Sequence, residues 1–308
     1  MMQKFVRKLA FWIIPLIALH VMLGLFADGN TDDNYRHFTS QASSIILGDS
    51  RGSQAIVPSV LNSYFNDKRF DNFSLNISQS PYGPLYLKAL KKKIVPDTKD
   101  GIFILTVSPW NLSTQKDINK EKDLPENKIS PFRNMHFYNL NPNYEYLLKN
   151  LNSSWFNIFR DRESVGKSNT YLHEDGWLEV TIDMSKQEAA KRTKEKVEFY
   201  NLFKDEQKMS NIRLQSFEEI IDFLKPKGQV YVVRIPTSEE IMKIENQYSP
   251  NFNQIIEEIT KRKKIHYFDF SPNFADYQYT DGNHMYKESS RKLTAQIVDS
   301  IRNIENLR

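Results

Sequence analysis

The chain contains no cysteine. Disulfides, thiolate metal sites and a cysteine nucleophile are therefore excluded, and thiol usage says nothing about the compartment in which the protein works. A zinc site would need histidine and carboxylate ligands, but the histidines show none of the HExxH or HxH spacings that such sites use. The six histidines are His20, His37, His136, His173, His266 and His284. We expect neither a metal nor another cofactor.

A strong excess of one charge is also missing. The 42 basic and 38 acidic residues give a net charge of only +4, and they are dispersed along the chain. This balance argues against a nucleic-acid partner, because binding to a polyanion usually needs a concentrated basic patch. With 308 residues, of which 40% are hydrophobic, the chain is long and apolar enough for one large domain plus an insertion or an anchor.

The N-terminus carries a long apolar run. Residues 9–27 are almost entirely apolar, and Lys4, Arg7 and Lys8 precede them. The run has close to the ~20 residues that cross a bilayer, and the positive-inside rule leaves its basic end in the cytoplasm. We therefore expect residues 1–27 to be a signal anchor that crosses the cytoplasmic membrane once. A polar tether, residues 28–42, would lead to an extracytoplasmic or periplasmic domain.

A cleaved signal peptide is the alternative for this N-terminal segment. Its apolar core would ordinarily be shorter, and no small-x-small cleavage motif stands out around Ala27. A buried core helix is a weaker alternative, because a helix without a polar face has no side to turn toward water. The uncleaved anchor is therefore favoured.

The remaining chain, residues 43–308, alternates between short apolar runs and segments with helical spacing. The expected strands are residues 44–47, 70–77, 101–107, 229–235 and 265–270. The expected helices cover residues 50–65, 82–94, 212–224, 238 onward, 252–261 and 287–304. Strands that alternate with helices predict a parallel sheet between two helical layers, with the active site at the carboxyl ends of the strands.

The alternation fails over residues 112–210, which are rich in Asn, Lys and aromatic residues. We interpret this stretch as an insertion that leaves the third strand at its carboxyl end and covers that edge of the sheet. Its aromatic residues are expected mainly to form a small core of the insertion itself. The triple lysine at 91–93 is expected to be a solvated helix end.

Two short motifs carry the candidate chemistry. Gly48-Asp49-Ser50 stands between the first strand and the first helix, and Asp281-Gly282-Asn283-His284 precedes the last helix. Either motif alone is often no more than a helix cap. Together they supply a serine nucleophile, a histidine base and a carboxylate that orients the histidine. Ser50, Asp281 and His284 are therefore the predicted catalytic triad.

The paired motifs resemble those of the SGNH (GDSL-like) hydrolase family. The resemblance covers about residues 43–305 outside the insertion, and it implies a flavodoxin-like three-layer α/β/α fold with serine esterase or acyltransferase activity. It also implies an oxyanion hole built from the N–H of Ser50, an N–H after the second strand and an asparagine after the third. Here Ile77 or Ser78 stands where the family has glycine, and Asn111 is the candidate asparagine, with an ordinary turn residue as its alternative reading.

Two further residues are candidates for binding substrate. Arg234 ends a predicted strand and is placed to hold an anionic group, although a surface salt bridge is the commoner role for such an arginine. His173 in the insertion is placed to line the site, although a histidine beside a turn glycine is more often an ordinary loop residue.

The leading functional hypothesis is ester chemistry on an acylated cell-envelope glycan or polymer. The resemblance to membrane-anchored SGNH proteins also suggests a membrane-bound acyltransferase as a partner. The alternative is a non-catalytic envelope assembly protein that keeps the fold. A phosphate-binding flavodoxin-like receiver is disfavoured, because the acidic cluster and the lysine that it needs are missing and the anchor points the domain outward.

Overall fold

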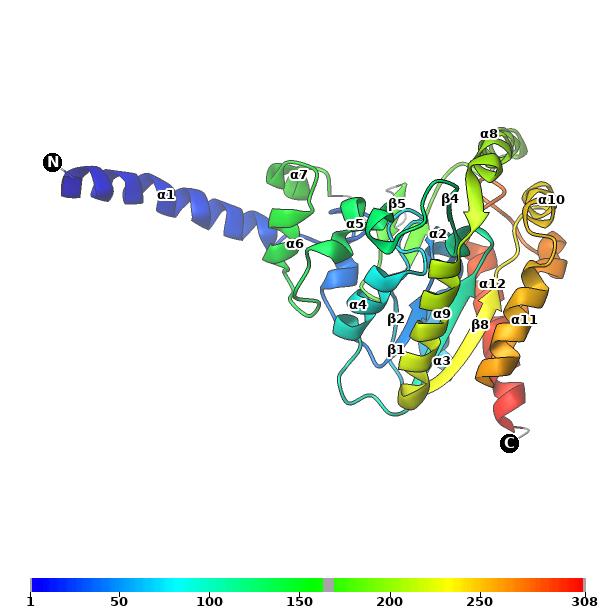
Figure 1. The fold of residues 1–308 in the computed structure, drawn as a ribbon. Coiled ribbons are helices and arrows are strands. Elements are labelled where there is room, and N and C mark those ends of the chain that lie inside the picture. The colour runs from blue at the N-terminus through cyan, green and yellow to red at the C-terminus, as the bar shows by residue number, and fades with distance from the viewer. Residues whose placement is uncertain (1, 163–168, 307–308) are drawn as a thin grey trace.

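A computed structural model describes residues 2–162 and 169–306 and contains a central parallel sheet (Figure 1). The sheet has five strands in the order β2-β1-β3-β8-β9, and every neighbouring pair is parallel. The strands are β1 (Ser44–Leu47), β2 (Phe70–Asn72), β3 (Gly101–Val107), β8 (Gly228–Arg234) and β9 (His266–Asp269). The predicted α/β class with a parallel sheet is thus confirmed. The second strand is shorter than predicted and ends at Asn72, whose N–H donates to the oxygen of Asp175 in the insertion.

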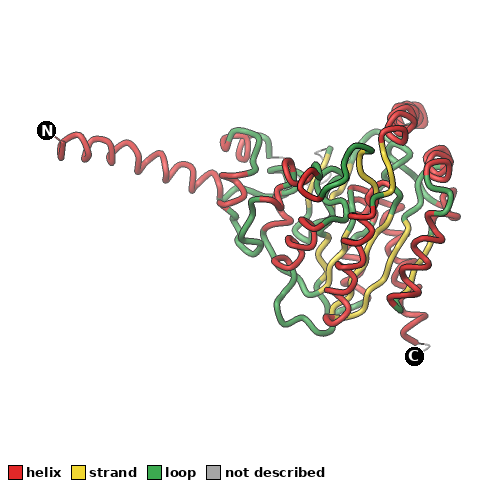
Figure 2. The backbone as a smooth tube through the Cα atoms, viewed as in Figure 1, coloured by secondary structure: helices red, strands yellow, loops and turns green. Residues whose placement is uncertain are grey.

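Helices cover both faces of this sheet (Figure 2). Successive strand side chains point to opposite faces, so Ile45 and Leu47 join one hydrophobic cluster and Ile46 joins another. On the first face lie α4 (Pro84–Lys93), α9 (Asn211–Leu224) and α11 (Phe252–Lys263). On the second lie α2 (Ser50–Ala55), α3 (Pro58–Tyr64) and α12 (Lys287–Asn306), while α10 (Glu239–Tyr248) lies at the carboxyl edge.

The helix expected over residues 50–65 is in fact two helices, α2 and α3. Pro58 is the first residue of α3. Proline has no N–H to donate to a preceding turn, and its fixed φ suits the start of a helix, so it separates the two. The short α2 keeps Ser50 close to the end of β1.

The N-terminal helix α1 (Met2–Gly24) projects away from the domain (Figure 1). Its most apolar 18-residue window has a mean hydropathy of 1.7, and none of that window is buried against the rest of the chain. By length and composition α1 is able to cross a membrane.

Residues 28–42 are packed into the domain and do not form the expected free tether. Tyr35 and Phe38 are fully buried and contact aromatic rings of the insertion. Lys93, which was expected to be solvated, is also fully buried. Its Nζ donates to the carbonyl oxygens of His37 (2.9 Å) and Ser40 (2.8 Å) and pairs with Oδ2 of Asp71 (2.9 Å). One lysine thus joins α4, β2 and the segment after the anchor.

Burial of this ion pair disfavours both charges. Burial lowers the pKa of Lys93 and raises the pKa of Asp71 to about 6, and the attraction between the two groups opposes both shifts. The pair therefore depends on keeping both partners in place.

The described residues of the insertion share the core of the sheet, whereas the sequence predicted a small core of the insertion itself. Phe132, Tyr138 and Tyr146 belong to the same buried cluster as Phe38 and Tyr86. Its elements are β4 (Ser113–Gln115), α5 (Glu126–Ile129), α6 (Tyr144–Lys149), α7 (Trp155–Arg160), β5 (Thr170–Leu172), β6 (Leu178–Val180), α8 (Lys186–Glu206) and β7 (Gln207–Met209). Residues 163–168 of the expected insertion lie outside the described residues. As predicted, α8 lies at the carboxyl edge of the sheet (Figure 1).

Replacing Lys93 with methionine tests how much the buried ion pair contributes to the stability of the fold. The substitution keeps most of the side-chain volume but leaves Asp71 without its partner. We expect the free energy of unfolding to fall by about 3–5 kcal/mol, the range for removing one member of a buried ion pair. Adding Asp71→Leu should recover part of that loss, because it removes the unpaired charge. Urea titration of the full chain in detergent micelles, followed by tryptophan fluorescence, measures both effects.

Lys91→Met is the matched control, because Lys91 lies on the same helix and is exposed. Its effect should stay within about 0.5 kcal/mol, as for most surface substitutions. Equal unfolding midpoints for Lys93→Met and Lys91→Met would contradict a stabilising role for the ion pair of Lys93 and Asp71.

Candidate active site

Ser50 is held at the carboxyl end of β1 by a turn that requires glycine. At Gly48 the φ angle is +157°, and a Cβ there would lie 1.9 Å from Oγ1 of Thr106 on the neighbouring strand. Asp49 then caps α2, because its Oδ1 accepts from the N–H of Arg51 at 3.0 Å. Ser50 follows as the first residue of α2 and is partly exposed.

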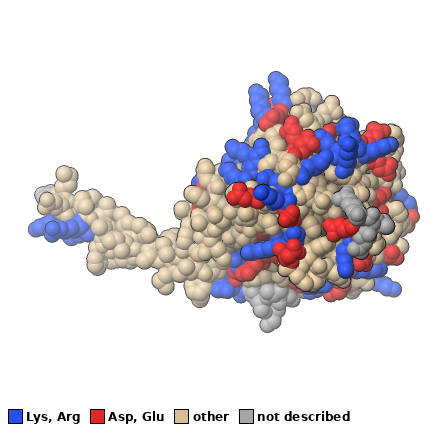
Figure 3. Space-filling model, turned by 90° about the horizontal axis from the view of Figure 1, so that it is seen from below, with Lys and Arg blue, Asp and Glu red and all other residues tan. Residues whose placement is uncertain are grey.

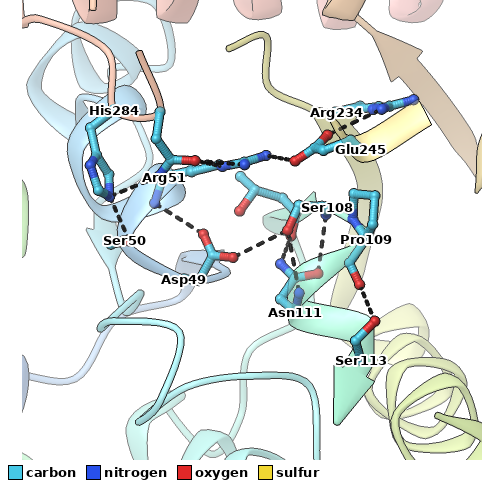
Figure 4. A network of polar contacts seen from close by, with 12 residues as sticks. Asp49, Ser50, Arg51, Ser108, Pro109, Asn111, Ser113, Arg234, Glu245 and His284 are labelled. Carbon is cyan, nitrogen blue, oxygen red and sulfur yellow. Dashed lines mark hydrogen bonds and ion pairs between the residues drawn. The ribbon is translucent and has the colours of Figure 1, made fainter. Parts of the chain in front are cut away.

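The three predicted triad residues form a continuous chain of hydrogen bonds. The distance from Ser50 Oγ to Nε2 of His284 is 2.8 Å, and that from His284 Nδ1 to Oδ2 of Asp281 is 2.9 Å. Asp281 Oδ1 also accepts from the N–H of His284 at 2.8 Å. Because a carboxylate can only accept, these partners assign the imidazole proton to Nδ1 and leave the lone pair of Nε2 for the serine hydroxyl. Figure 4 shows Ser50 and His284 facing each other.

The loop that carries Asp281 and His284 is fixed by its own backbone and by α8. Gly282 has a φ of +79°, and a Cβ there would lie 2.8 Å from the side chain of Thr193 on α8. The N–H of Thr280 donates to the oxygen of His284 at 2.8 Å, which closes the loop. From α8, Nε of Arg192 donates to the oxygen of Thr280 at 2.7 Å. The insertion thereby helps to fix the positions of His284 and Asp281.

The charge state of Asp281 suits an orienting carboxylate. Burial by itself would raise the pKa of Asp281, but the charge of His284, its hydrogen bonds and the nearby Lys196 outweigh burial and hold that pKa below the usual range. Lys196 Nζ lies 3.3 Å from Oδ2 of Asp281. The carboxylate is therefore ionised at neutral pH and can stabilise a protonated imidazole.

A buried chain of charges lies behind the triad. Nη1 of Arg51 forms an ion pair with Oε1 of Glu245 at 2.6 Å, and Oε2 of Glu245 pairs with Nη2 of Arg234 at 3.2 Å. These side chains are 4%, 1% and 4% exposed, so the contacts are shielded from water. Figure 4 shows the chain running from the triad toward β8.

Arg51 also fixes an amide beside the reacting atoms. Its Nε and Nη2 donate to Oδ1 of Asn283 at 2.9 and 2.6 Å, which turns the amide nitrogen toward the histidine. Nδ2 of Asn283 lies 3.1 Å from Nε2 of His284. Neither residue was predicted from the sequence, although each adjoins a triad member. No spacing rule pointed to Glu245, because its partnership with Arg51 exists only in the folded chain.

The candidate oxyanion residues are placed differently from the triad. Asn111 is 1% exposed, its Nδ2 donates to the oxygen of Thr106 at 3.0 Å, and its Oδ1 accepts from the N–H of Ser108 at 3.1 Å. Its side chain thus closes the loop after β3, as expected of the turn residue that was the alternative reading (Figure 4). We therefore assign Asn111 to that loop.

Ile77 and Ser78 lie in the turn after β2. The N–H of Ser78 donates to Oδ1 of Asn76 at 3.0 Å, so this predicted donor is already used. Ile77 packs against the buried cluster that contains Trp110 and Tyr200. Together with Trp110 and residues of α8, both line a cavity of about 340 Å³.

The two candidate substrate-binding residues have partners within the protein. Arg234 is buried at 3% exposure, and besides Glu245 its Nη1 donates to Oδ1 of Asn253 at 2.7 Å. We therefore assign Arg234 to the buried charge chain, which corrects both the substrate role and the surface salt bridge. His173 is hydrogen-bonded to Glu179 at 2.8 Å and stacks on Trp177 within the β5–β6 hairpin.

This arrangement has the parts that nucleophilic serine chemistry needs. It provides a hydroxyl, a base whose tautomer is set, an ionised carboxylate and an amide donor next to the base. Among residues 2–162 and 169–306, no three histidine, aspartate or glutamate side chains gather as a candidate metal site. Comparison with known proteins finds no matching family model and no matching curated protein.

Proposed function

We propose that this chain is a serine esterase or O-acyltransferase with Ser50 as nucleophile, His284 as general base and Asp281 as the carboxylate that orients His284. The observation that carries the proposal is the unbroken relay of 2.8 and 2.9 Å contacts from Ser50 Oγ to Asp281. The three side chains come from two distant segments and follow one another in the order serine, histidine, aspartate. The imidazole proton is on Nδ1, which is the tautomer that acyl transfer needs. The resemblance of the two motifs to those of SGNH hydrolases supports the same chemistry.

The first half-reaction transfers the acyl group to the enzyme. Ser50 Oγ attacks the carbonyl carbon of an ester while its proton passes to Nε2 of His284. The resulting tetrahedral intermediate breaks its bond to the leaving alcohol, and His284 returns the proton to that alcohol. In the second half-reaction, water or another hydroxyl attacks the acyl-serine while His284 takes its proton; the bond between the acyl carbon and Ser50 Oγ then breaks, and His284 returns the proton to Ser50 Oγ. Asp281 stays ionised throughout and stabilises the imidazolium.

The developing oxyanion needs hydrogen-bond donors, and Asn283 is placed to be one. Nε2 of neutral His284 has one lone pair, which both the Ser50 hydroxyl and the Asn283 amide face. Once Nε2 takes the serine proton it can no longer accept, and the amide N–H becomes free for the oxyanion. The backbone N–H of Ser50 is the second donor that we propose. This assignment replaces Asn111, whose side chain is used inside the loop after β3.

The proposed substrate is an acylated glycan or polymer of the cell envelope. The support is positional, because α1 is able to anchor the domain in a membrane and Ser50 and His284 are partly exposed at the sheet edge. The basic residues before α1 favour a domain outside the cytoplasm. In that setting a membrane-bound acyltransferase is the proposed source of acyl groups for transfer, whereas water as acceptor gives hydrolysis.

Substitutions in the triad test the proposed mechanism on an activated aryl ester. Ser50→Ala and His284→Ala should each lower kcat by about 10⁴-fold or more, because triad members act as a unit. For the same reason the double variant should be no slower than either single one. Asp281→Asn should lose about 10⁴-fold, since an amide favours the wrong imidazole tautomer. Initial rates of aryl alcohol release by the full chain in detergent measure all four variants.

His173→Ala is a suitable control, because that histidine bonds to Glu179 within a hairpin. Its rate should stay near that of the wild type. Multiplicative losses in the Ser50→Ala/His284→Ala double variant would contradict a shared mechanism. A folded wild-type chain with no turnover on esters and no acyl transfer to added alcohols would favour the non-catalytic assembly protein.

The role of Asn283 as an oxyanion donor has its own test. Asn283→Ala removes the amide, and Asn283→Asp keeps an oxygen acceptor for Arg51 but replaces the N–H donor. We expect both variants to lose about 10²–10³-fold in kcat with little change in KM, the range for removing one oxyanion donor. Steady-state kinetics, with circular dichroism as a check on folding, give the result. A purely structural role predicts instead that Asn283→Asp restores the wild-type rate.

A further inference from the structure

The end of α1 is fastened to the insertion by specific contacts. The hydroxyl of Tyr144 donates to the carbonyl oxygen of Val21 at 2.8 Å. The ring of His20 lies 5.2 Å from that of Trp155, and the ring of Phe26 lies 5.2 Å from that of Phe159. Gly24 is buried against Tyr144, where a Cβ would lie 2.3 Å from the ring. Helices α6 and α7 therefore sit beside residues 20–26.

These contacts fix how close α6 and α7 lie to a membrane that α1 crosses. Because α1 ends at Gly24, its apolar residues 9–24 form about 24 Å of helix at 1.5 Å per residue, somewhat less than the roughly 30 Å of a hydrocarbon core. His20 lies about 6 Å before Gly24, the last residue of α1, by the same rise. A span that uses the whole of α1 after Lys8 thus places the outer boundary of the hydrocarbon core at or beyond Gly24, so Trp155, which contacts His20, lies at or inside that boundary.

The surface of α6 and α7 has the composition of a membrane interface. Leu148, Phe156 and Phe159 are 75%, 54% and 51% exposed, a high value for large apolar side chains on neighbouring helices. The adjoining loop adds exposed Phe137 and Leu140. Trp155 and Tyr144 contact the span itself, and these two residue types are enriched where proteins meet the headgroup region. On the face shown in Figure 3, charged side chains gather on the far side of the domain, and the part next to α1 is almost free of them.

We infer that α6 and α7 form a second membrane contact, a collar that dips into the outer leaflet of the bilayer around α1. The collar consists of Leu148, Phe156 and Phe159, with Trp155 and Tyr144 as its link to the span. A single helix alone would let the domain tilt and turn on its anchor, whereas a helix plus a collar fixes its orientation. In Figure 1 the strands run across the direction of α1. With α1 crossing the bilayer, the collar therefore holds the strands along the bilayer surface, and the carboxyl edge of the sheet faces sideways. This inference does not depend on the proposed chemistry.

The absence of cysteine allows a direct measurement of depth. Single cysteines at Leu148→Cys and Phe156→Cys, each spin-labelled, report the collar, and Glu258→Cys on exposed α11 is the matched control. The two collar side chains are more than half exposed, so the substitutions leave the core intact. The full-length chain is reconstituted into vesicles of phosphatidylcholine and phosphatidylglycerol. Power-saturation EPR then compares collisions with oxygen, which concentrates in lipid, and with a water-soluble nickel chelate.

We expect the labels at 148 and 156 to collide more with oxygen than with the nickel chelate, and the label at 258 to show the reverse. Nickel accessibility at 148 and 156 equal to that at 258, in vesicles, would overturn the collar. Because none of these readings involves turnover, failure of the collar and failure of the ester chemistry are distinguishable.

Discussion

The ion pair between Arg51 and Glu245 is the interaction on which the proposed site depends. Removing two charges from water is expensive, and such a pair is maintained only when further hydrogen bonds satisfy both partners. Here Arg51 also bonds to Asn283, and Glu245 also pairs with Arg234. The pair therefore connects the nucleophile segment, the histidine loop, α10 and β8. Losing either charge would disturb all four at once.

The insertion contributes to this constraint as well. Arg192 and Lys196 of α8 bond to the histidine loop, and Thr193 packs against the left-handed Gly282. The insertion is thus part of the active-site framework, and its aromatic residues complete the core beside α4. An excised insertion would leave Phe38 and Tyr86 without their cover, so the domain is not expected to fold without it. At its other end, α6 and α7 meet the anchor.

The sequence predicted what depends on local patterns. Continuous apolar runs located the five parallel strands, and two motifs located Ser50, Asp281 and His284, which the structure brings into contact. Their catalytic role stays a prediction. Side chains whose role depends on residues far away in the sequence were not predicted. Lys93 was expected to be a solvated helix end, and only the fold shows that Asp71 and two carbonyl oxygens surround it. Arg234 was missed as a structural residue for the same reason. The split at Pro58, in contrast, was readable from the sequence.

Asn111 illustrates the limit of transferring a role through a motif. It has the expected place after β3, but an amide can serve either the local loop or a ligand, and only side-chain geometry distinguishes the two. The loop uses both ends of this amide. Asn283 shows the converse, since an unremarkable position between Gly282 and His284 becomes important once Arg51 orients it.

The central claim is that Ser50 is a nucleophile activated by His284. A fluorophosphonate probe tests it without knowledge of the substrate, because the probe forms a covalent bond only with an activated serine. The full chain is incubated with the probe in detergent, digested and mapped by peptide mass spectrometry. The account predicts one labelled peptide, modified at Ser50, in the wild type, and no label there in His284→Ala. A folded wild-type chain that stays unlabelled at Ser50, or labelling that persists in His284→Ala, would contradict it.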